Sequence, residues 1–475
     1  MVSDKRIAMR FCGQEFPIDT ERIDCVNLSI GDLTPLREFK NLRELRLLIT
    51  NPHRHIDHSV ADLSPIGDLK RLKILELSKS QVRDLGPLKS LKNLTSLNLS
   101  STPVEDITAL HELKSLKELN ISHTLVSSLD ALKGLKSLTS LQFRGTPVRD
   151  LTPLKELRNL EDLGISDTQI TDLTPLVDLK VIKEAERLDF SGTQVRTLAP
   201  LKNAMNLKEL LLFHTPISDL TSLQAMTNLE SLWLDSTAVS DLAPLKDLRH
   251  LTHLSLSSTE VEDLSALREL KNLRELNLED SHVYDLGPLS ELVNLEELVL
   301  RGTPVSNLSP LTALNNLLRL QIEDTRVHDL TPLRTLRNLE GLNLARTPVS
   351  DVSALQGLKN LTWLHLENTS INDLRPLGEL GNLEDLWLNN TSVKDLTPLG
   401  NLKNLKRLYL ENTPVTDLMT LKGLQKLIFL QLQNTSVDDQ QLAELRELLP
   451  NLSISQEAGF RRPKSHNRAM GAQDE

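Results

Sequence analysis

The chain has 475 residues, of which 39% are hydrophobic and only 3% aromatic, and its net charge is -11 at pH 7. A surface that neutralises phosphates must be basic, so this charge argues against nucleic acid as a partner. No run of about 18 apolar residues occurs, and the first residues show no signal-peptide pattern. We therefore expect no membrane partner, and a protein that is cytoplasmic or exported without a classical signal peptide.

Residues 1–30 are predicted to form an N-terminal cap. Within it, residues 6–12 are expected to form one strand of a hairpin and residues 22–28 a partial repeat. Cys12 and Cys25 are the only cysteines, too few for the several disulfides that usually close the ends of extracellular repeat proteins. Because Cys25 falls on an inward position of the partial repeat, we expect it to be a reduced core thiol.

Residues 31–437 repeat about eighteen times, mostly with a period of 22. One unit, residues 94–115, has apolar side chains at Leu94, Leu97, Leu99, Val104, Ile107, Leu110 and Leu113. Side chains alternate along a strand, so the fourth and sixth places of each unit should face the core, and the third, fifth, seventh and eighth should lie on the surface. A single unit cannot bury its own apolar side, so the units must stack into one parallel sheet.

Each strand is followed by a return segment such as Asp150-Leu151-Thr152-Pro153-Leu154. Aspartate suits the cap of a short helical turn, and proline is tolerated in a first turn because its missing N–H had no partner there. The ninth place holds threonine in nearly every unit, as in Thr102 and Thr124. We expect these hydroxyls to form a ladder that bonds neighbouring backbone.

Another repeat shows the pattern in full at Asn159, Leu160, Leu163, Ile165, Thr168, Ile170 and the segment 172–176. These residues resemble the repeats of two known kinds of protein, the bacterial internalins and the leucine-rich regulatory subunit of type 1 phosphatase. The resemblance extends over residues 20–454 and implies an α/β solenoid. Its expected form is a curved leucine-rich-repeat horseshoe with a parallel β-sheet on the concave face and short helical or extended turns on the convex face. Threonine replaces the asparagine that internalins usually carry at the ninth place.

Two units are longer than the rest, near residues 51–58 and near residues 181–186. The first insertion contains His53, His55 and His58 with Asp57, which are residue types that bind transition metals. Arg54 lies among them, and no spacing places them on one face. We therefore expect a solvated loop and no metal site.

Residues 438–455 are predicted to form a C-terminal cap. Leucines at 442, 445, 448 and 449 indicate an amphipathic helix over residues 438–449, and a last strand is expected at 452–454. Residues 456–475 contain Arg461, Arg462, Lys464 and Arg468 and few apolar side chains. They are predicted to be a disordered tail.

No pattern of catalytic residues is visible. The chain has no glycine-rich phosphate loop, nucleophile elbow or zinc-ligand spacing, and only about twenty residues lie on either side of the repeats. We expect a monomer that is not an enzyme, with no cofactor, acting as a protein-binding scaffold, adaptor or inhibitor that grips a protein on its concave face. The alternatives are a regulatory or targeting subunit of an enzyme, and a bacterial effector delivered to a host.

Aromatic side chains at the outward places predict where a partner binds, because folding requires none there. Two columns on successive strands contain His365, Trp387, Tyr409 and Gln431, and Trp363, Asp385, Arg407 and Phe429. Phe213 and Trp233 are predicted to form a secondary contact. Since none of these residues is expected in the core, Trp387→Ala and Tyr409→Ala should weaken binding and barely change stability. The alternative is that the rings pack on one another across the sheet.

Acidic residues outnumber basic ones at the same outward places, so most of the net charge is expected on the concave sheet. The densest acidic part contains Glu275, Glu279, Asp280, Glu297, Glu323 and Asp324, relieved by Arg301 and Arg319. Such a face would steer a partner with a basic surface. The alternative is that these charges are simply solvated.

Overall fold

The computed structural model describes residues 8–26, 30–48 and 59–456, so the histidine-rich insertion and the predicted tail lie outside the described residues. The chain divides into two compact units, Met1–Met226 and Thr227–Glu475, which are described in turn. No helix in the described part of the chain is long and apolar enough to cross a membrane.

The first unit begins with a short antiparallel hairpin. Strand β1 (Ala8–Phe11) pairs with β2 (Gln14–Pro17) through a two-residue turn at Cys12 and Gly13. Both turn residues have positive φ, 39° and 76°, the combination that matches the twist of the flanking strands. The second strand was missed in the sequence because Gln14–Pro17 is short and mostly polar and ends in proline.

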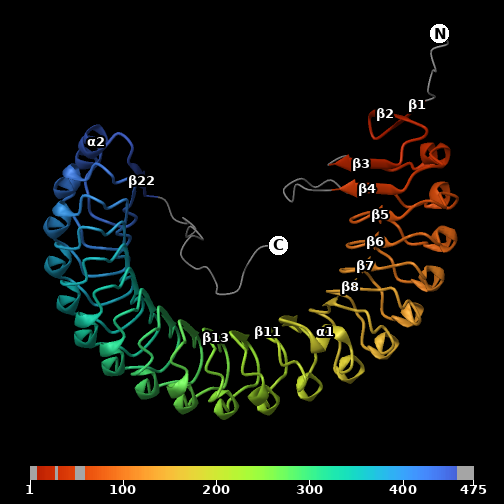
Figure 1. Cartoon of the computed structure of the whole chain (residues 1–475). Coiled ribbons are helices and arrows are strands. Elements are labelled where there is room, and N and C mark those ends of the chain that lie inside the picture. The colour runs from red at the N-terminus through yellow and green to blue at the C-terminus, as the bar shows by residue number, and fades with distance from the viewer. Residues whose placement is uncertain (1–7, 27–29, 49–58, 457–475) are drawn as a thin grey trace, which may run out of the picture. The chain divides into compact units, whose positions relative to one another are not determined.

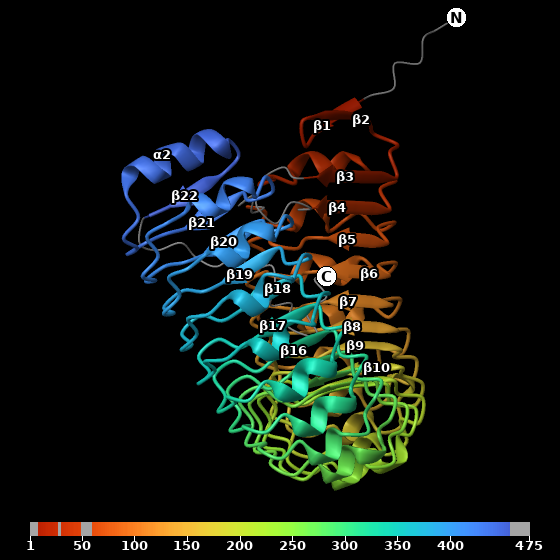
Figure 2. The same ribbon diagram turned by 90° about the vertical axis from the view of Figure 1, so that its left-hand side faces the viewer.

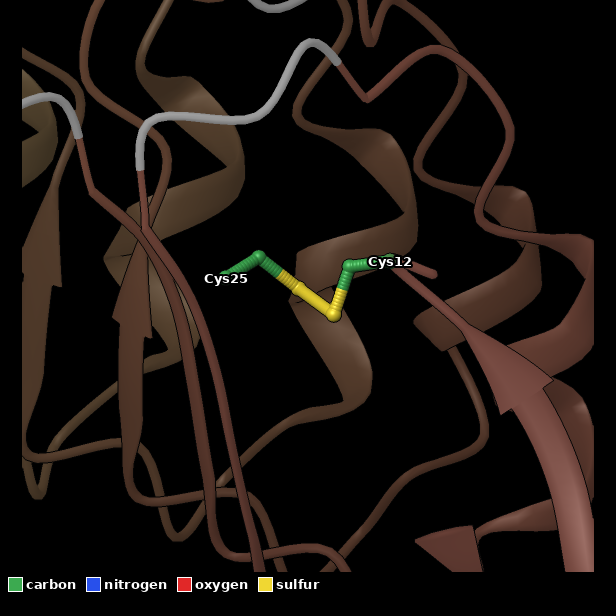
Figure 3. The surroundings of a disulfide bond; sticks show 2 residues. All are labelled: Cys12 and Cys25. Carbon is green, nitrogen blue, oxygen red and sulfur yellow. A yellow bond between two sulfur atoms is a disulfide. The ribbon is translucent and has the colours of Figure 1, made fainter. Parts of the chain in front are cut away.

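A disulfide joins this turn to the first strand of the parallel sheet, β3 (Arg22–Val26). Cys12 and Cys25 are bonded, with their Cα atoms 5.9 Å apart, and Cys25 is fully buried (Figure 3). The prediction of a reduced thiol at Cys25 is therefore wrong. Sequence spacing placed Cys25 inward correctly, but it could not show that the hairpin turn lies against the inward side of β3.

The strands of the first unit follow one another in chain order and belong to two parallel sheets, with the interruption between the strands Asp162–Gly164 and Arg187–Asp189. After β3 they are β4 (Glu44–Leu48), β5 (Ile74–Glu76), β6 (Ser96–Asn98), β7 (Glu118–Asn120), β8 (Ser140–Gln142), β9 (Asp162–Gly164), β10 (Arg187–Asp189) and β11 (Glu209–Leu211). Equivalent residues of successive repeats are partners in the sheet, as in Leu97↔Leu119. The lengthened repeat near residues 181–186 contains a single turn of helix, α1 (Lys180–Lys183).

The second unit has the same pattern of short parallel strands. Its strands are β12 (Ser231–Trp233), β13 (His253–Ser255), β14 (Glu275–Asn277), β15 (Glu297–Val299), β16 (Arg319–Gln321), β17 (Gly341–Asn343), β18 (Trp363–His365), β19 (Asp385–Trp387), β20 (Arg407–Tyr409), β21 (Phe429–Gln431) and β22 (Ser453–Ser455). Helix α2 (Asp439–Leu448) precedes β22 and lies at the end of this unit, beside β21 and β22 (Figure 2). Asp438 caps α2 by accepting a hydrogen bond from Gln441 N at 2.8 Å.

Short 3-10 helices form the other side of each unit. In the first unit they are Thr34–Glu38, Ser64–Ile66, Gly86–Ser90, Thr108–Glu112, Asp130–Leu132, Thr152–Leu154, Thr174–Leu176, Ala199–Leu201 and Thr221–Ala225. In the second they are Ala243–Leu245, Ser265–Glu269, Gly287–Leu289, Ser309–Ala313, Thr331–Thr335, Ser353–Leu355, Arg375–Leu377, Thr397–Asn401 and Met419–Gly423. Within each unit the strands line the inner side of an arc and the 3-10 helices its outer side (Figure 1).

The return aspartates start these turns. Asp150 Oδ1, for example, accepts a hydrogen bond of 2.8 Å from the backbone N–H of Thr152, the first residue of its 3-10 helix. Asn307 replaces the aspartate in one repeat, and its Oδ1 accepts a hydrogen bond of 2.9 Å from the backbone N–H of Ser309. The leucines between strand and turn are almost completely buried, so the aliphatic core runs the length of each unit.

Threonine hydroxyls at the ninth place bond within their own repeat. Thr102 Oγ1 donates to the carbonyl of Leu99 at 2.5 Å, and the other ninth-place threonines follow the same pattern. These hydroxyls bond neighbouring backbone as predicted, but the carbonyl that accepts the bond is three residues earlier in the same repeat, so these bonds do not link one repeat to the next. Side-chain bonds between repeats come from other positions, such as Asn93, whose Nδ2 donates to Lys70 O at 2.8 Å, and Thr95, whose Oγ1 donates to Lys73 O at 3.1 Å.

Candidate partner-binding surface

Strand register brings the two predicted columns side by side on the inner face of the second unit. Residue 363 is the partner of 385, 385 of 407 and 407 of 429. In the other column, 365 pairs with 387, 387 with 409 and 409 with 431. The period of 22 made this alignment predictable, because equivalent places of stacked units must be neighbours.

Five rings form a continuous series, here called the aromatic ladder: Trp363, His365, Trp387, Tyr409 and Phe429. Successive ring centroids are 5.2, 5.1, 3.7 and 5.3 Å apart. Trp387 and Tyr409 are stacked, with 17° between their planes, and the other pairs are tilted. The rings thus pack on one another across the sheet, while all except Tyr409 remain half-buried and reach the surface.

Tyr409 is the covered member of the aromatic ladder. Only 1% of its surface is exposed, and burial raises the pKa of its hydroxyl to about 12. The premise that Tyr409 lies outside any core is wrong, because stacking by Trp387 and contact with Phe429 cover an outward position. Tyr409 therefore supports the neighbouring rings and is not itself a contact surface.

The charged pair in the second column is internal. Asp385 is 3% exposed and forms an ion pair with Arg407 on the next strand. A hydrogen bond to Asp385 raises the pKa of Arg407, whose side chain keeps 30% of its surface exposed. Gln431 is buried too, and its Nε2 donates to Glu411 Oε2 at 2.8 Å. Of the eight predicted contact residues, those that present a ring to the surface are Trp363, His365, Trp387 and Phe429.

Gly341 on β17 sets the position of the first ring. A Cβ atom at Gly341 would lie 2.0 Å from Cε2 of the Trp363 indole, so this ring lies directly over the glycine backbone. Any side chain at this place would displace Trp363. Gly341 was not among the predicted residues, although an isolated glycine at an outward strand place is itself a signal of close approach.

Eighth-place residues do not continue the strands. Asp280, Asp324 and Arg346 have φ of 52°, 56° and 55°, and the equivalent residues of the other described repeats are also left-handed. Asparagine, which tolerates this conformation, takes the place in the last four repeats. There Asn412 Nδ2 donates to Asn390 Oδ1 at 2.6 Å, and Asn434 Nδ2 donates to Asn412 Oδ1 at 2.7 Å.

Three of the six predicted acidic contacts are neutralised by an arginine one repeat further on. The pairs are Glu279 with Arg301 at 2.5 Å, Glu297 with Arg319 at 2.6 Å, and Asp324 with Arg346 at 2.5 Å. Arg301 and Arg319 were expected beside these acids from the sequence, but Arg346 was not. The steering charge that this cluster can exert is therefore smaller than its composition suggested.

The remaining three acids differ from one another. Asp280 is exposed. Glu275 lies 3.7 Å from His253, and burial raises its pKa. Glu323 is only 5% exposed, its Oε2 has no hydrogen-bond partner among the described residues, and burial raises its pKa to about 7.

The two residues of the predicted secondary contact belong to different units. Phe213 is half-buried at a seventh place in the first unit, and Trp233 is 7% exposed on β12 in the second. A buried indole offers little surface to a partner. Within the described ranges no three His, Cys, Asp or Glu side chains are grouped so that they could hold a metal ion.

Comparison with known proteins agrees with this architecture. The family model for leucine-rich repeats in two copies matches residues 70–112, 206–247 and 381–425. No curated protein sequence matches the chain. Among solved structures, an internalin of Listeria monocytogenes, InlF, is 26% identical with a TM-score of 0.51, over 74% of this chain and 88% of that one.

Two further structures share the fold. A leucine-rich-repeat protein of Leptospira interrogans is 22% identical with a TM-score of 0.68, over 83% of this chain and 98% of that one. A plant peptide hormone receptor, RGFR1 in complex with RGF2, is 16% identical with a TM-score of 0.52, over 93% of this chain and 96% of that one. The predicted solenoid is confirmed, and the chain is a leucine-rich-repeat protein whose repeats resemble those of the internalins.

Proposed function

We propose that the inner face of the second unit binds a protein or peptide partner through the aromatic ladder. The observation that carries this proposal is that four rings reach the surface in a position that the fold does not require. Leucines at the fourth and sixth places fill the core without them. Large aromatic side chains on a surface are the residues that most often dominate protein interfaces.

The ladder is also held in place before a partner arrives. Tyr409 supports Trp387 from the next strand, Gly341 receives the indole of Trp363, and the Asp385–Arg407 pair lies between the end rings of its column. A surface whose side chains are already fixed loses less conformational entropy on binding. This rigidity suits an adaptor or inhibitor that grips its partner without a chemical step.

The related solved structures support a binding role. The plant peptide hormone receptor RGFR1 forms a complex with RGF2, and leucine-rich-repeat proteins are generally interaction scaffolds or receptors. We extend this role to the present chain on the basis of the aromatic ladder, and we place the binding surface on β18 to β21.

Affinity capture with mass spectrometry should recover the partner, and substitution should then locate the contact. We expect Trp387→Ala to weaken binding by about 2 kcal/mol, measured by isothermal titration calorimetry. The matched control is Tyr284→Ala, since Tyr284 is 58% exposed and lies outside the strands. Equal affinity of the two variants would exclude the aromatic ladder as the site.

A further inference from the structure

The seventh places of the second unit carry a second, regular feature. Every alternate repeat has a carboxylate there, at Asp235, Glu279, Glu323, Glu367 and Glu411, here called the acidic column. The intervening seventh places hold Ser257, Arg301, Ala345 and Asn389. The carboxylates therefore recur every 44 residues along the chain, which is every second strand of the sheet.

Backbone hydrogen bonds keep this column in register. The N–H of each eighth-place residue donates to the seventh-place carbonyl of the next repeat, as in Gly302 N to Glu323 O at 3.0 Å and Arg346 N to Glu367 O at 2.9 Å. Neighbouring strands of a sheet lie about 4.8 Å apart, so the acidic column has a period of about 9.6 Å. Three residues make one turn of a polyproline-like chain, which returns a side chain to the same face after about 9.3 Å.

Glu323, in the middle of the column, has an incomplete set of partners. Only 5% of its surface is exposed, and its Oε2 accepts no hydrogen bond from a described residue. The two nearest cations are engaged elsewhere: Arg301 binds Glu279, and Arg346 donates two hydrogen bonds of 2.5 Å to Asp324. A buried carboxylate oxygen without a hydrogen bond is unfavourable, so a cation added at Oε2 would recover free energy.

We propose that the acidic column binds an extended basic segment of a partner protein whose lysine or arginine side chains recur at every third residue. Matched periods allow successive cations to meet successive carboxylates while the segment runs across the strands. The fifth-place rings of the aromatic ladder lie two residues before the seventh places of the same repeats, so the segment would lie alongside the ladder. This inference rests on the proposed binding function and names the chemistry of the partner.

The test uses fluorescently labelled glycine peptides with four arginines each, titrated against the full chain at low salt and followed by anisotropy. One peptide has arginine at every third position and the other has the four arginines together. We expect the spaced peptide to bind at least about tenfold more tightly, because total charge is the same and only register differs. Equal affinities, or no binding of either peptide, would overturn the proposal.

Substitutions locate the contact. Glu323→Gln should reduce the affinity for the spaced peptide to that for the clustered one, whereas Glu262→Gln, an exposed carboxylate outside the strands, should leave the difference intact. Glu411→Gln provides a second test at a half-buried member of the column. Thermal melts of each variant show whether the fold is retained. Loss of spacing preference in the Glu262 variant alone would contradict the assignment.

The chain has a basic segment of its own at Arg461, Arg462, Lys464 and Arg468. Deleting residues 457–475 should leave the affinity for the spaced peptide within about twofold. A tenfold increase in this affinity would mean that residues 457–475 occupy the acidic column, and it would overturn the proposal of an external partner. If the peptides fail while Trp387→Ala still abolishes capture of the partner, only the inference about the acidic column is lost.

Discussion

The two units share one framework but present different inner faces. In the first unit serine fills most seventh places, at Ser78, Ser100, Ser122, Ser166 and Ser191, with Arg144 between them. In the second, carboxylates alternate at the same places, and rings occupy the third and fifth places of β18 to β21. The buried leucines are equivalent in both. The core therefore does not constrain the outward side chains, and chemistry that differs between units on one framework indicates function.

The ends of the two units are also closed differently. A disulfide ties the first hairpin to β3, whereas a capped helix, α2, covers the end of the second unit before β22. The end repeat of a solenoid lacks one neighbour, so it needs another source of stability. One end uses a covalent bond and the other uses apolar burial by Leu442 and Leu445.

Core substitutions should have the largest effect, and an equal one in both units. Leu141→Ala in the first and Leu386→Ala in the second each remove a side chain that is 0% exposed. We expect each to lower the free energy of unfolding by about 2 to 5 kcal/mol through the cavity left behind. Urea unfolding measures this. A loss below about 1 kcal/mol in one unit only would mean that the frameworks are not equivalent.

Substitutions at outward places should affect stability differently in the two units, and Tyr409→Ala tests this in the second unit. We expect a loss of about 3 kcal/mol in stability, because the ring is buried between Trp387 and Phe429. Ser122→Ala, at an outward place of the first unit, should change stability little. Tyr409→Phe keeps the ring and is the matched control in thermal unfolding. If Tyr409→Ala were as mild as Tyr409→Phe, ring packing would not support the ladder.

Breaking the disulfide should destabilise the N-terminal cap. The double substitution of Cys12 and Cys25 by serine is expected to cost about 2 to 4 kcal/mol, as is typical for a bond that constrains the unfolded chain. Hydrogen exchange measured by mass spectrometry should show faster exchange in β1 to β4 and unchanged exchange in β18 to β21. Free thiols in the denatured, unreduced wild-type protein would show that the bond is not formed.

Glu323 should make the free energy of unfolding of the second unit depend on pH. Its folded pKa, about 7, lies above the ordinary value of 4.5, so between pH 4.5 and 7 the folded state binds the proton more tightly than the unfolded state. This contribution is complete below about pH 4.5 and is lost as pH rises through 7, a change on the order of 3 kcal/mol. Arg301, Arg346 and Glu279 are the charged groups that face it.

The measurement is the difference in unfolding free energy between wild type and Glu323→Gln at pH 5 and pH 8. We expect the variant to be relatively more stable at pH 8, since a neutral amide has no charge to bury. Glu262→Gln, which changes an exposed carboxylate, should give no such difference. A pH-independent difference for Glu323→Gln would show that this carboxylate is already ionised at pH 5.

The repeat alone determined the solenoid, the inward leucines and the alignment of the two columns on β18 to β21. A period of 22 places equivalent residues of stacked units next to each other, so both faces follow from counting along the chain. The capping role of aspartates such as Asp150 followed in the same way, because their bond is local.

Only the tertiary structure decided which outward residues remain accessible. Tyr409 is covered by neighbouring rings, and Asp385 is paired with Arg407. Asp324 is neutralised by Arg346, and Cys12 is bonded to Cys25. Each of these outcomes depends on how a side chain meets its neighbour in the next repeat, or on how the hairpin turns back onto β3. Periodicity determines the position in the sheet from which a side chain projects. Packing and pairing with neighbouring side chains determine whether its outer atoms are accessible to a partner.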